Sequence, residues 1–238
     1  MFEHLKKDIQ AALDKDPAAK SKWEVLLTYS GVKALFYYRI AHKLHIRGHK
    51  LLARMLSQRA RRKTGIEIHP GAVIGEGLFI DHGAGVVIGE TTEIGDNVTI
   101  YQGVTLGGTG KDVGKRHPTI GNNVMISAGA KILGPVVVGD NSKVGAGSVV
   151  LKNVPPHSTI VGVPGRVVRM YGEKYNDLDQ KLPDPILEEF ARLNKRIITL
   201  EEKLGVNACK YSISNEIPAD AVQASCEPQR HDDKKIIS

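Results

Sequence analysis

An aliphatic residue recurs at every sixth position between Ile68 and Val150, and this period constrains the fold more than any other feature of the chain. Thirteen residues keep the phase in three runs, separated by a two-residue slip and a longer excursion: Ile68, Ile74, Ile80; Ile88, Ile94, Ile100, Leu106; Ile120, Ile126, Ile132, Val138, Val144 and Val150. A period of six fits neither an amphipathic helix, at about 3.6 residues, nor an alternating strand, at about two. It suits stacked coils of short strands, each with one aliphatic side chain inside. An irregular glycine-rich region would not keep this phase, so the sequence predicts a β-helix of hexapeptide repeats.

Glycine follows the inward residue in seven of the repeats: Gly75, Gly89, Gly95, Gly107, Gly121, Gly139 and Gly145. We expect these glycines to turn the backbone through positive φ, where a Cβ atom would clash. The chain has 25 glycines but only 5% aromatic residues. The interior should therefore consist of stacked aliphatic side chains with little room for rings.

The repeats divide the chain into three predicted domains. Residues 1–65 have helical spacing, broken at residues 14–17, and form an N-terminal helical domain. Residues 66–171 form the β-helix, and residues 172–238 form a C-terminal helix followed by a polar tail that we expect to be disordered. Apolar residues three and four apart between Phe190 and Leu204 resemble a short heptad seam, which we hypothesise extends an oligomer as a coiled coil.

Composition excludes several classes of protein. No apolar run approaches the roughly 20 residues of a membrane helix, and the charged, helical N-terminus does not resemble a secretory signal. Two cysteines, Cys209 and Cys226, cannot form a disulfide framework, which favours the cytoplasm. The net charge of +7 is compatible with an anionic ligand. The basic run at residues 59–63 lacks interleaved aromatic residues, so we interpret it as a solvated helix end rather than a nucleic-acid site.

Two breaks in the repeat are the candidate functional positions. At the first, Asp81 stands in place of the turn glycine after Ile80, His82 follows it, and the two-residue slip comes next. A histidine beside a carboxylate can act as a general base near neutral pH. A lone histidine is more often structural, but Glu67 lies fifteen residues earlier, nearly one coil below His82. The second break is the excursion 107–118, rich in glycine and basic residues, which can contact phosphate although it is not a Walker motif.

Four motifs together resemble bacterial serine O-acetyltransferases: IDH at 80–82, QGVTLGGTGK at 102–111, RHP at 116–118 and GVPGR at 162–166. The resemblance runs from about Asp14 to Arg166. It implies a left-handed parallel β-helix assembled as trimers with active sites between subunits. It also implies the reaction of acetyl-CoA with L-serine to give O-acetyl-L-serine and CoA, the first step of cysteine biosynthesis from serine. Acetyl-CoA is then a co-substrate, and no permanently bound cofactor is expected.

The resemblance also assigns roles to the residues at both breaks. His82 matches the general base, and Glu67 stands where many relatives have an aspartate that orients this histidine. Asp81 joins them in the catalytic set. Asp81 and Asp16 match the acidic residues that hold the substrate ammonium group. Arg116 and His117 match the residues near its carboxylate, which suits the two charged ends of an amino acid.

Small residues match the positions along the pantetheine arm of CoA: Gly108, Ala128 and Ala146. The alternative interpretation is that these three are ordinary turn and packing residues, which bind no ligand. Lys131 and Lys143 are either phosphate partners or solvated surface residues.

Further partners follow from the same resemblance. L-cysteine is expected as a feedback inhibitor in the serine site, with its thiol near His82. Many relatives have a longer helical N-terminus that joins two trimers, so the sequence leaves trimer and hexamer open. Relatives that dock to O-acetylserine sulfhydrylase end in isoleucine, whereas this chain ends in Ser238, so that docking is not expected.

Three alternatives remain open from the residues alone. An O-acetyltransferase for sugars or antibiotics would use the same scaffold and a histidine, but would lack the set Asp16, Asp81 and Arg116. A γ-type carbonic anhydrase needs three histidine ligands, and the third would fall on Asn122, so no metal site is expected. If the chain were a non-enzymatic β-helix scaffold, nothing would explain why the repeat is broken at these two positions.

Overall fold

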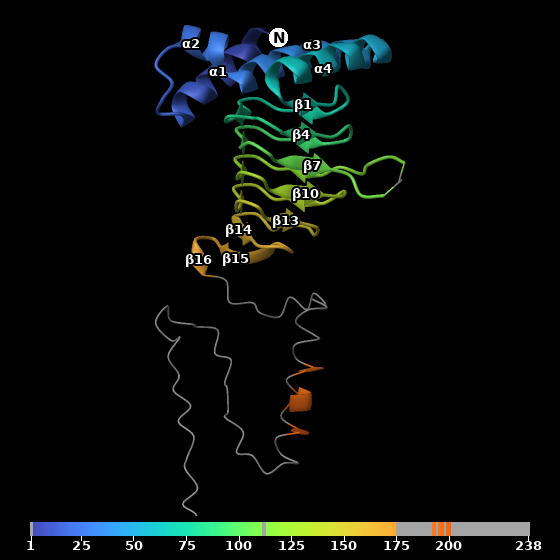
Figure 1. Ribbon diagram of the computed structural model, residues 1–238. Coiled ribbons are helices and arrows are strands. Elements are labelled where there is room, and N and C mark those ends of the chain that lie inside the picture. The colour runs from blue at the N-terminus through green and yellow to red at the C-terminus, as the bar shows by residue number, and fades with distance from the viewer. Residues whose placement is uncertain (1, 111–112, 175–191, 194, 198, 201–238) are drawn as a thin grey trace, which may run out of the picture. The chain divides into compact units, whose positions relative to one another are not determined.

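The computed structural model describes residues 2–110, 113–174, 192–193, 195–197 and 199–200 (Figure 1). The chain divides into two compact units, Met1–Asp177 and Leu178–Ser238. In the second unit the described residues are helical. Leu193, Ile197 and Leu200 of the predicted heptad seam are described, whereas Phe190, Leu204, both cysteines and the C-terminal residues lie outside the described residues.

Four helices form a layer across one end of the first unit (Figure 1): α1 (Phe2–Lys15), α2 (Lys22–Thr28), α3 (Ser30–Ile46) and α4 (Lys50–Thr64). The predicted break after α1 is confirmed, and α2 begins where the Ser21 hydroxyl accepts a hydrogen bond from the Glu24 amide at 3.2 Å. Gly65, with a left-handed φ of 72°, ends α4. No helix among the described residues is long and apolar enough to cross a membrane.

Thirteen short strands follow, one for each predicted repeat: β1 (Glu67–Ile68), β2 (Val73–Ile74), β3 (Phe79–Ile80), β4 (Val87–Ile88), β5 (Glu93–Ile94), β6 (Thr99–Ile100), β7 (Thr105–Gly107), β8 (Thr119–Ile120), β9 (Met125–Ile126), β10 (Lys131–Leu133), β11 (Val137–Val138), β12 (Lys143–Val144) and β13 (Val149–Val150). The predicted phase is confirmed, because all thirteen periodic residues are buried, none more than 7% exposed. They form one continuous aliphatic core.

The strands form three parallel faces, as in a β-helix. The first face contains β1, β4, β7, β10 and β13, and the second contains β2, β5, β8 and β11. The third contains β3, β6, β9 and β12, followed by β14 (Ser158–Val161), β15 (Arg166–Met170) and β16 (Glu173–Lys174). Ile68 pairs in register with Ile88, and Ile88 pairs with Leu106, so each inward aliphatic side chain stacks on an aliphatic side chain of the next coil. The antiparallel pair β14–β15 ends the parallel stack.

The predicted role of the glycines after the inward residues is wrong, because none of those seven glycines has a positive φ. They are needed because successive coils approach closely. A Cβ atom on Gly75 would lie 2.8 Å from the carbonyl carbon of Gly95, and one on Gly95 would lie 2.9 Å from that of Gly121.

The left-handed residues lie two positions further along, at the third residue after the inward one, on the second and third faces: Gly77, Gly83, Asn97, Gly103, Asn123, Gly129, Asn141 and Gly147. The corresponding residues after the first face, among them Thr91, do not have positive φ. The corner after the first face therefore has a different backbone from the other two.

The helical layer covers the backbone carbonyls of the first coil. In each coil the strand amides donate to carbonyls of the next coil, as Glu67 does to Val86 and Phe79 to Val98, both at 2.9 Å. The first coil's own carbonyls are left without a preceding coil. Side chains of α3 and α4 bind them: Ser57 to Ile68 at 2.8 Å, His42 to Pro70 at 2.8 Å, Tyr38 to Ala72 at 2.6 Å, and Arg39 to Ile74 at 3.0 Å and Gly75 at 2.8 Å. These contacts fix the helices on the open end of the stack.

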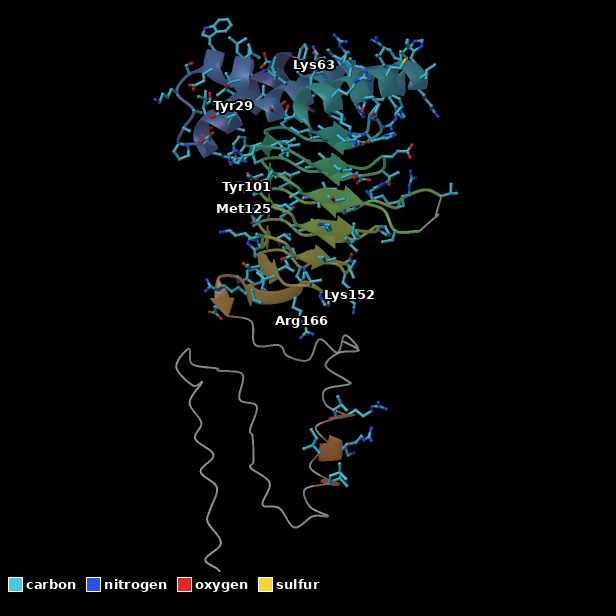
Figure 2. The ribbon with its side chains drawn as sticks, in the orientation of Figure 1. Tyr29, Lys63, Tyr101, Met125, Lys152 and Arg166 are labelled. Atoms are coloured by element: carbon cyan, nitrogen blue, oxygen red, sulfur yellow. The ribbon has the colours of Figure 1, made fainter. Side chains whose placement is uncertain are left out.

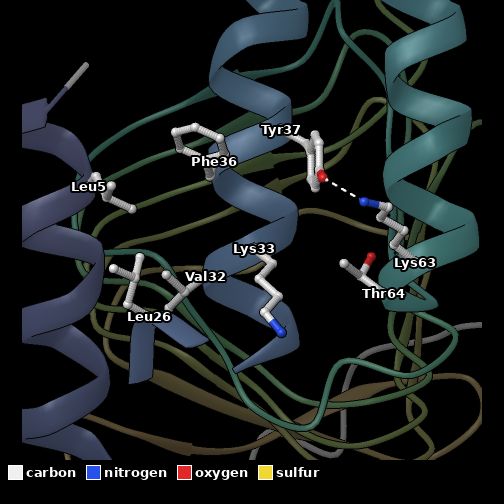
Figure 3. Close-up of a pocket in the computed structure, with 8 residues that line it drawn as sticks. All are labelled: Leu5, Leu26, Val32, Lys33, Phe36, Tyr37, Lys63 and Thr64. Atoms are coloured by element: carbon white, nitrogen blue, oxygen red, sulfur yellow. Dashed lines mark hydrogen bonds between the residues drawn. The ribbon is translucent and has the colours of Figure 1, made fainter. Parts of the chain in front are cut away.

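A pocket of about 590 Å³ lies among the helices (Figure 3). Its lining is mainly apolar, with Leu5, Val32 and Phe36 on its walls, and the Lys63 ammonium group contacts the Tyr37 hydroxyl at 3.2 Å. None of the predicted site residues lines it.

The close approach of the coils predicts a difference between two glycine substitutions. Gly95→Ala should lower the free energy of unfolding by about 1–3 kcal/mol, because its Cβ atom would overlap the next coil's backbone. Gly147→Asn should cost less, because no atom lies within 4 Å and Asn tolerates a left-handed φ. Thermal unfolding at equal protein concentration measures both. Equal losses would contradict the assignment of Gly95 to close packing.

Asp8 predicts a pH dependence of stability. It is buried in α1 with Arg39 Nη2 at 3.4 Å, and burial raises its pKa to about 6 although the guanidinium opposes this shift. The folded state thus holds the proton more tightly than the unfolded chain, so Asp8 destabilises the fold progressively as pH rises from about 4 to 6. Relative to the Asp8→Asn variant, the native chain should lose up to about 3 kcal/mol between these pH values, measured by urea unfolding. Parallel stability curves would contradict the raised pKa.

Candidate active site

The first break in the repeat lies at the corner between β3 and β4. His82 has a φ of 56°, a left-handed value that is uncommon outside glycine. Its side chain is 74% exposed, and Nε2 lies 3.8 Å from Asp81 Oδ1, beyond hydrogen-bond distance. The corner therefore holds an accessible imidazole beside a partly buried carboxylate.

Asp16 lies in the same region, at the end of α1. Its Oδ2 accepts a hydrogen bond from the Tyr29 hydroxyl at 2.5 Å, and its Oδ1 accepts one from the Ala18 amide at 2.8 Å. These bonds, the one from Tyr29 foremost, hold the pKa of Asp16 below its usual range, and the same bond raises the pKa of Tyr29 to about 12. Asp16 is also close enough to His82 for their charges to interact. We call Asp16, Tyr29, Asp81 and His82 the acidic cluster.

Close packing of α3 on the first coil positions this cluster. Tyr29 immediately precedes α3 and lies in the helical layer beside the coils (Figure 2). A Cβ atom on Gly31 would lie 2.4 Å from the Ile80 carbonyl oxygen, so only glycine lets the start of α3 reach the backbone next to Asp81. The sequence did not single out Tyr29 or Gly31.

Glu67 lies on β1, one coil before β4 on the first face. Its carboxylate forms an ion pair with Arg61 Nε of α4 at 3.3 Å. Among the described residues no hydrogen bond or ion pair joins Glu67 to His82, so its role in orienting that ring stays a prediction.

The end of the excursion forms a second group at the corner after the first face. Arg116 pairs with the Glu90 carboxylate, which holds the pKa of Glu90 below its usual range. His117 is nearly buried and packs against Thr91, with Nδ1 2.9 Å from the threonine hydroxyl. Burial lowers the pKa of His117. We call Glu90, Thr91, Arg116 and His117 the basic cluster.

Glycine makes room for this cluster too. A Cβ atom on Gly89 would lie 1.9 Å from His117 Cδ2, and one on Gly108 would lie 3.1 Å from the Arg116 carbonyl oxygen. The sequence prediction missed Glu90 and Thr91. The sequence did contain a pattern that indicates this contact. The carboxylates of Glu90 and Glu93 follow β4, and a run of three basic residues at 115–117 lies one coil further along.

The two clusters occupy different corners of one chain. The acidic cluster precedes β4 and the basic cluster follows it, so the first face separates them. Ala128 and Ala146 lie on successive coils at the acidic cluster's corner, where the Gly147 amide donates to the Ala128 carbonyl at 2.9 Å. Gly108 lies instead beside the basic cluster. A single chain thus does not bring all predicted site residues together.

Comparisons with known proteins identify the family of this chain. Residues 117–152 match the family model "Bacterial transferase hexapeptide (six repeats)". The chain is 58% identical over 205 residues to the serine acetyltransferase of Bacillus subtilis, covering 85% of this chain and 94% of that protein.

Solved structures are similar as well. The Neisseria gonorrhoeae serine acetyltransferase in complex with serine is 45% identical, with a TM-score of 0.69 over 71% of this chain and 69% of that one. The Brucella abortus enzyme in complex with coenzyme A is 48% identical, with a TM-score of 0.70 over 71% and 68%. A serine acetyltransferase in complex with cysteine is 47% identical, with a TM-score of 0.69 over 70% and 69%. With this identity over nearly the whole length of its relatives, the chain belongs to the serine acetyltransferase family, enzymes that are acyl-CoA-dependent O-acyltransferases.

Proposed function

We propose that His82 is the general base with which this chain carries out the reaction of its family. The enzyme transfers the acetyl group of acetyl-CoA to the hydroxyl of L-serine, giving O-acetyl-L-serine and CoA. The observation that carries the assignment is the exposed His82 imidazole, beside Asp81, at the position where the repeat is broken. The identity of 58% to a serine acetyltransferase supports the reaction itself.

The chemistry needs one proton transfer in each direction. The neutral imidazole of His82 takes the proton of the serine hydroxyl as its oxygen attacks the thioester carbonyl. The tetrahedral intermediate collapses with cleavage of the carbon–sulfur bond. The imidazolium then returns its proton to the leaving thiolate, so His82 ends the cycle neutral. Asp81 and Glu67 supply negative charge that favours the transient imidazolium.

Serine recognition uses the two clusters. Asp16 and Asp81 bind the ammonium group, and the Tyr29 hydrogen bond keeps Asp16 ionised. Arg116 and His117 bind the carboxylate. The guanidinium has five N–H groups, so its contact with Glu90 leaves donors for the substrate.

A complete site then combines two copies of the chain. The separation of the clusters across the first face supports a homotrimer in which the acidic cluster of one subunit meets the basic cluster of its neighbour. We assign the coil the left-handed sense, residues 1–65 to the helical domain, 66–171 to the catalytic β-helix and 172–238 to the tail.

Coenzyme A binds along the coil edge in this proposal. Ala128 and Ala146, adjacent on successive coils, leave space for the pantetheine arm on one subunit, and Gly108 leaves space on the other. The structure of a 48% identical relative with coenzyme A supports acetyl-CoA as the co-substrate. L-cysteine shares both charged ends of L-serine, and the relative solved with cysteine supports inhibition at the serine site. We place the reaction in the cytoplasm, where acetyl-CoA is available.

His82→Asn tests the base. Asn tolerates the left-handed φ of 56°, so the fold should persist while kcat/KM for L-serine falls by about 10²–10⁴-fold. His157→Asn is the matched control, since His157 has the same φ and lies outside both clusters. Release of the CoA thiol measures the rate with L-serine and with sugar acceptors. Full activity of His82→Asn would exclude the base, and a faster rate with a sugar would exclude the serine assignment.

Tyr29→Phe tests the state of Asp16. Loss of the hydroxyl removes the first cause of its lowered pKa, so the Asp16 carboxylate should protonate at a higher pH and the KM for L-serine should rise first at acidic pH. Carboxyl carbon NMR titration follows Asp16 directly. Tyr37→Phe, which removes only the hydroxyl bound by Lys63, should leave this titration unchanged. An unshifted Asp16 in Tyr29→Phe would contradict the proposed effect.

A further inference from the structure

Thr91 holds the end of the excursion in place through both its backbone and its side chain. Its hydroxyl oxygen accepts hydrogen bonds from the amides of Arg116 and His117, each at 3.1 Å. Its carbonyl oxygen accepts one from the Lys115 ammonium group at 2.8 Å. One residue of the preceding coil thus contacts three consecutive residues that return from the loop.

The same residue determines where His117 carries its proton. The Thr91 amide, which can only donate, lies 3.2 Å from His117 Nδ1. The Thr91 hydroxyl already accepts two amides, so its own hydrogen is directed to Nδ1 at 2.9 Å. Because two donors are directed at Nδ1, this nitrogen must be unprotonated and act as an acceptor. The proton of the neutral ring must then lie on Nε2.

Nε2 lies beside Gly89 and Gly108. Cβ atoms built on Gly89 and Gly108 would lie 2.2 Å and 3.4 Å from it, so the ring can occupy this position only because Gly89 has no side chain. Among the described residues Nε2 has no hydrogen-bond partner. It is therefore the ring nitrogen that is left to donate to a ligand, and the proposed function places the substrate carboxylate at this cluster.

We propose that Thr91 is a positioning residue that fixes His117 in the Nε2–H tautomer, as a neutral donor to the serine carboxylate. The proposal rests on the proposed function for the location of that carboxylate. It also separates the roles of the two histidines. A ring whose Nδ1 is occupied and whose Nε2 is protonated cannot accept the serine hydroxyl proton, so His117 cannot compete with His82 as the base.

The surroundings of His117 favour the neutral ring. Burial is the first cause of its lowered pKa, and the positive charges of Arg116 and Lys115 act in the same direction, whereas Glu90 opposes them. Glu90 is itself paired with Arg116. The guanidinium thus supplies the positive charge for the substrate, and the imidazole supplies a second, uncharged donor.

The neighbouring residue provides a matched control. Thr92 is fully buried, and its hydroxyl has no hydrogen-bond partner in the described part of the chain. Thr92→Val therefore makes the same chemical change as Thr91→Val, at the next position, without removing a contact to His117. Thr91→Ser keeps the hydroxyl, so this variant should behave like the native enzyme.

Ring-nitrogen NMR of the full-length enzyme labelled with ¹⁵N-histidine reads the tautomer directly. The His117 signal is assigned as the one lost in His117→Asn. The native enzyme, Thr91→Ser and Thr92→Val should show His117 as neutral Nε2–H at pH 7.5. Thr91→Val should shift the signal toward a mixture of both tautomers. An Nδ1–H or doubly protonated ring in the native enzyme would overturn the proposal, even if Thr91→Val fails to fold.

Kinetics supply the second readout. Thr91→Val should raise the KM for L-serine about tenfold, as for one weakened hydrogen bond, with changes below about threefold in kcat and in the KM for acetyl-CoA. Thr91→Ser and Thr92→Val should stay within about twofold of the native values. A fixed tautomer combined with an unchanged KM in Thr91→Val would overturn the role in serine binding. Failure of the native enzyme to acetylate serine would instead refute the proposed function, because the tautomer is measured without substrate.

Discussion

The hydrogen bonds between the helical layer and the carbonyls of the first coil are the contacts on which the rest of the structure depends. In a parallel coil the backbone amides donate hydrogen bonds to the next coil, and the backbone carbonyls accept them from the coil before. The first coil has no coil before it, so its carbonyls form a row of acceptors that need other partners. Tyr38, Arg39 and Ser57 bind that row. Because the same helical layer brings Tyr29 and Asp16 to the corner of His82, covering the open end also assembles the acidic cluster.

The two kinds of corner explain why the site residues gather where they do. Corners after the second and third faces need a left-handed residue at a fixed position, and His82 extends this strain to the residue before Gly83. The corner after the first face has no such requirement, so the chain can leave it as a loop and return. The basic cluster lies there, with Glu90 and Thr91 on one coil and Arg116 and His117 on the next.

The sequence predicted the coil well because each repeat has one position that must be aliphatic, and all thirteen of these residues are buried. It predicted wrongly why glycine is required at Gly75 and Gly95. The period and the residue type cannot distinguish a glycine that adopts a positive φ from one that lets two coils pack closely. Asp16 and Arg116 came from the resemblance to a family. Tyr29, Glu90 and Thr91 were missed because their roles depend on contacts between segments 13 to 26 residues apart, which no local pattern records.

The position of the excursion has a consequence for how this fold diversifies. The excursion leaves at Gly107, the last residue of β7, and returns before β8, while both strands keep the register of their faces. Lengthening or replacing the loop therefore costs little more than its closure entropy and leaves the aliphatic core intact. Under the proposed function, the coils that carry Ala128 and Ala146 can stay constant while the loop that brings Arg116 and His117 to the acceptor changes. A lineage built on this coil can thus acquire new acceptors through insertions and substitutions at one corner.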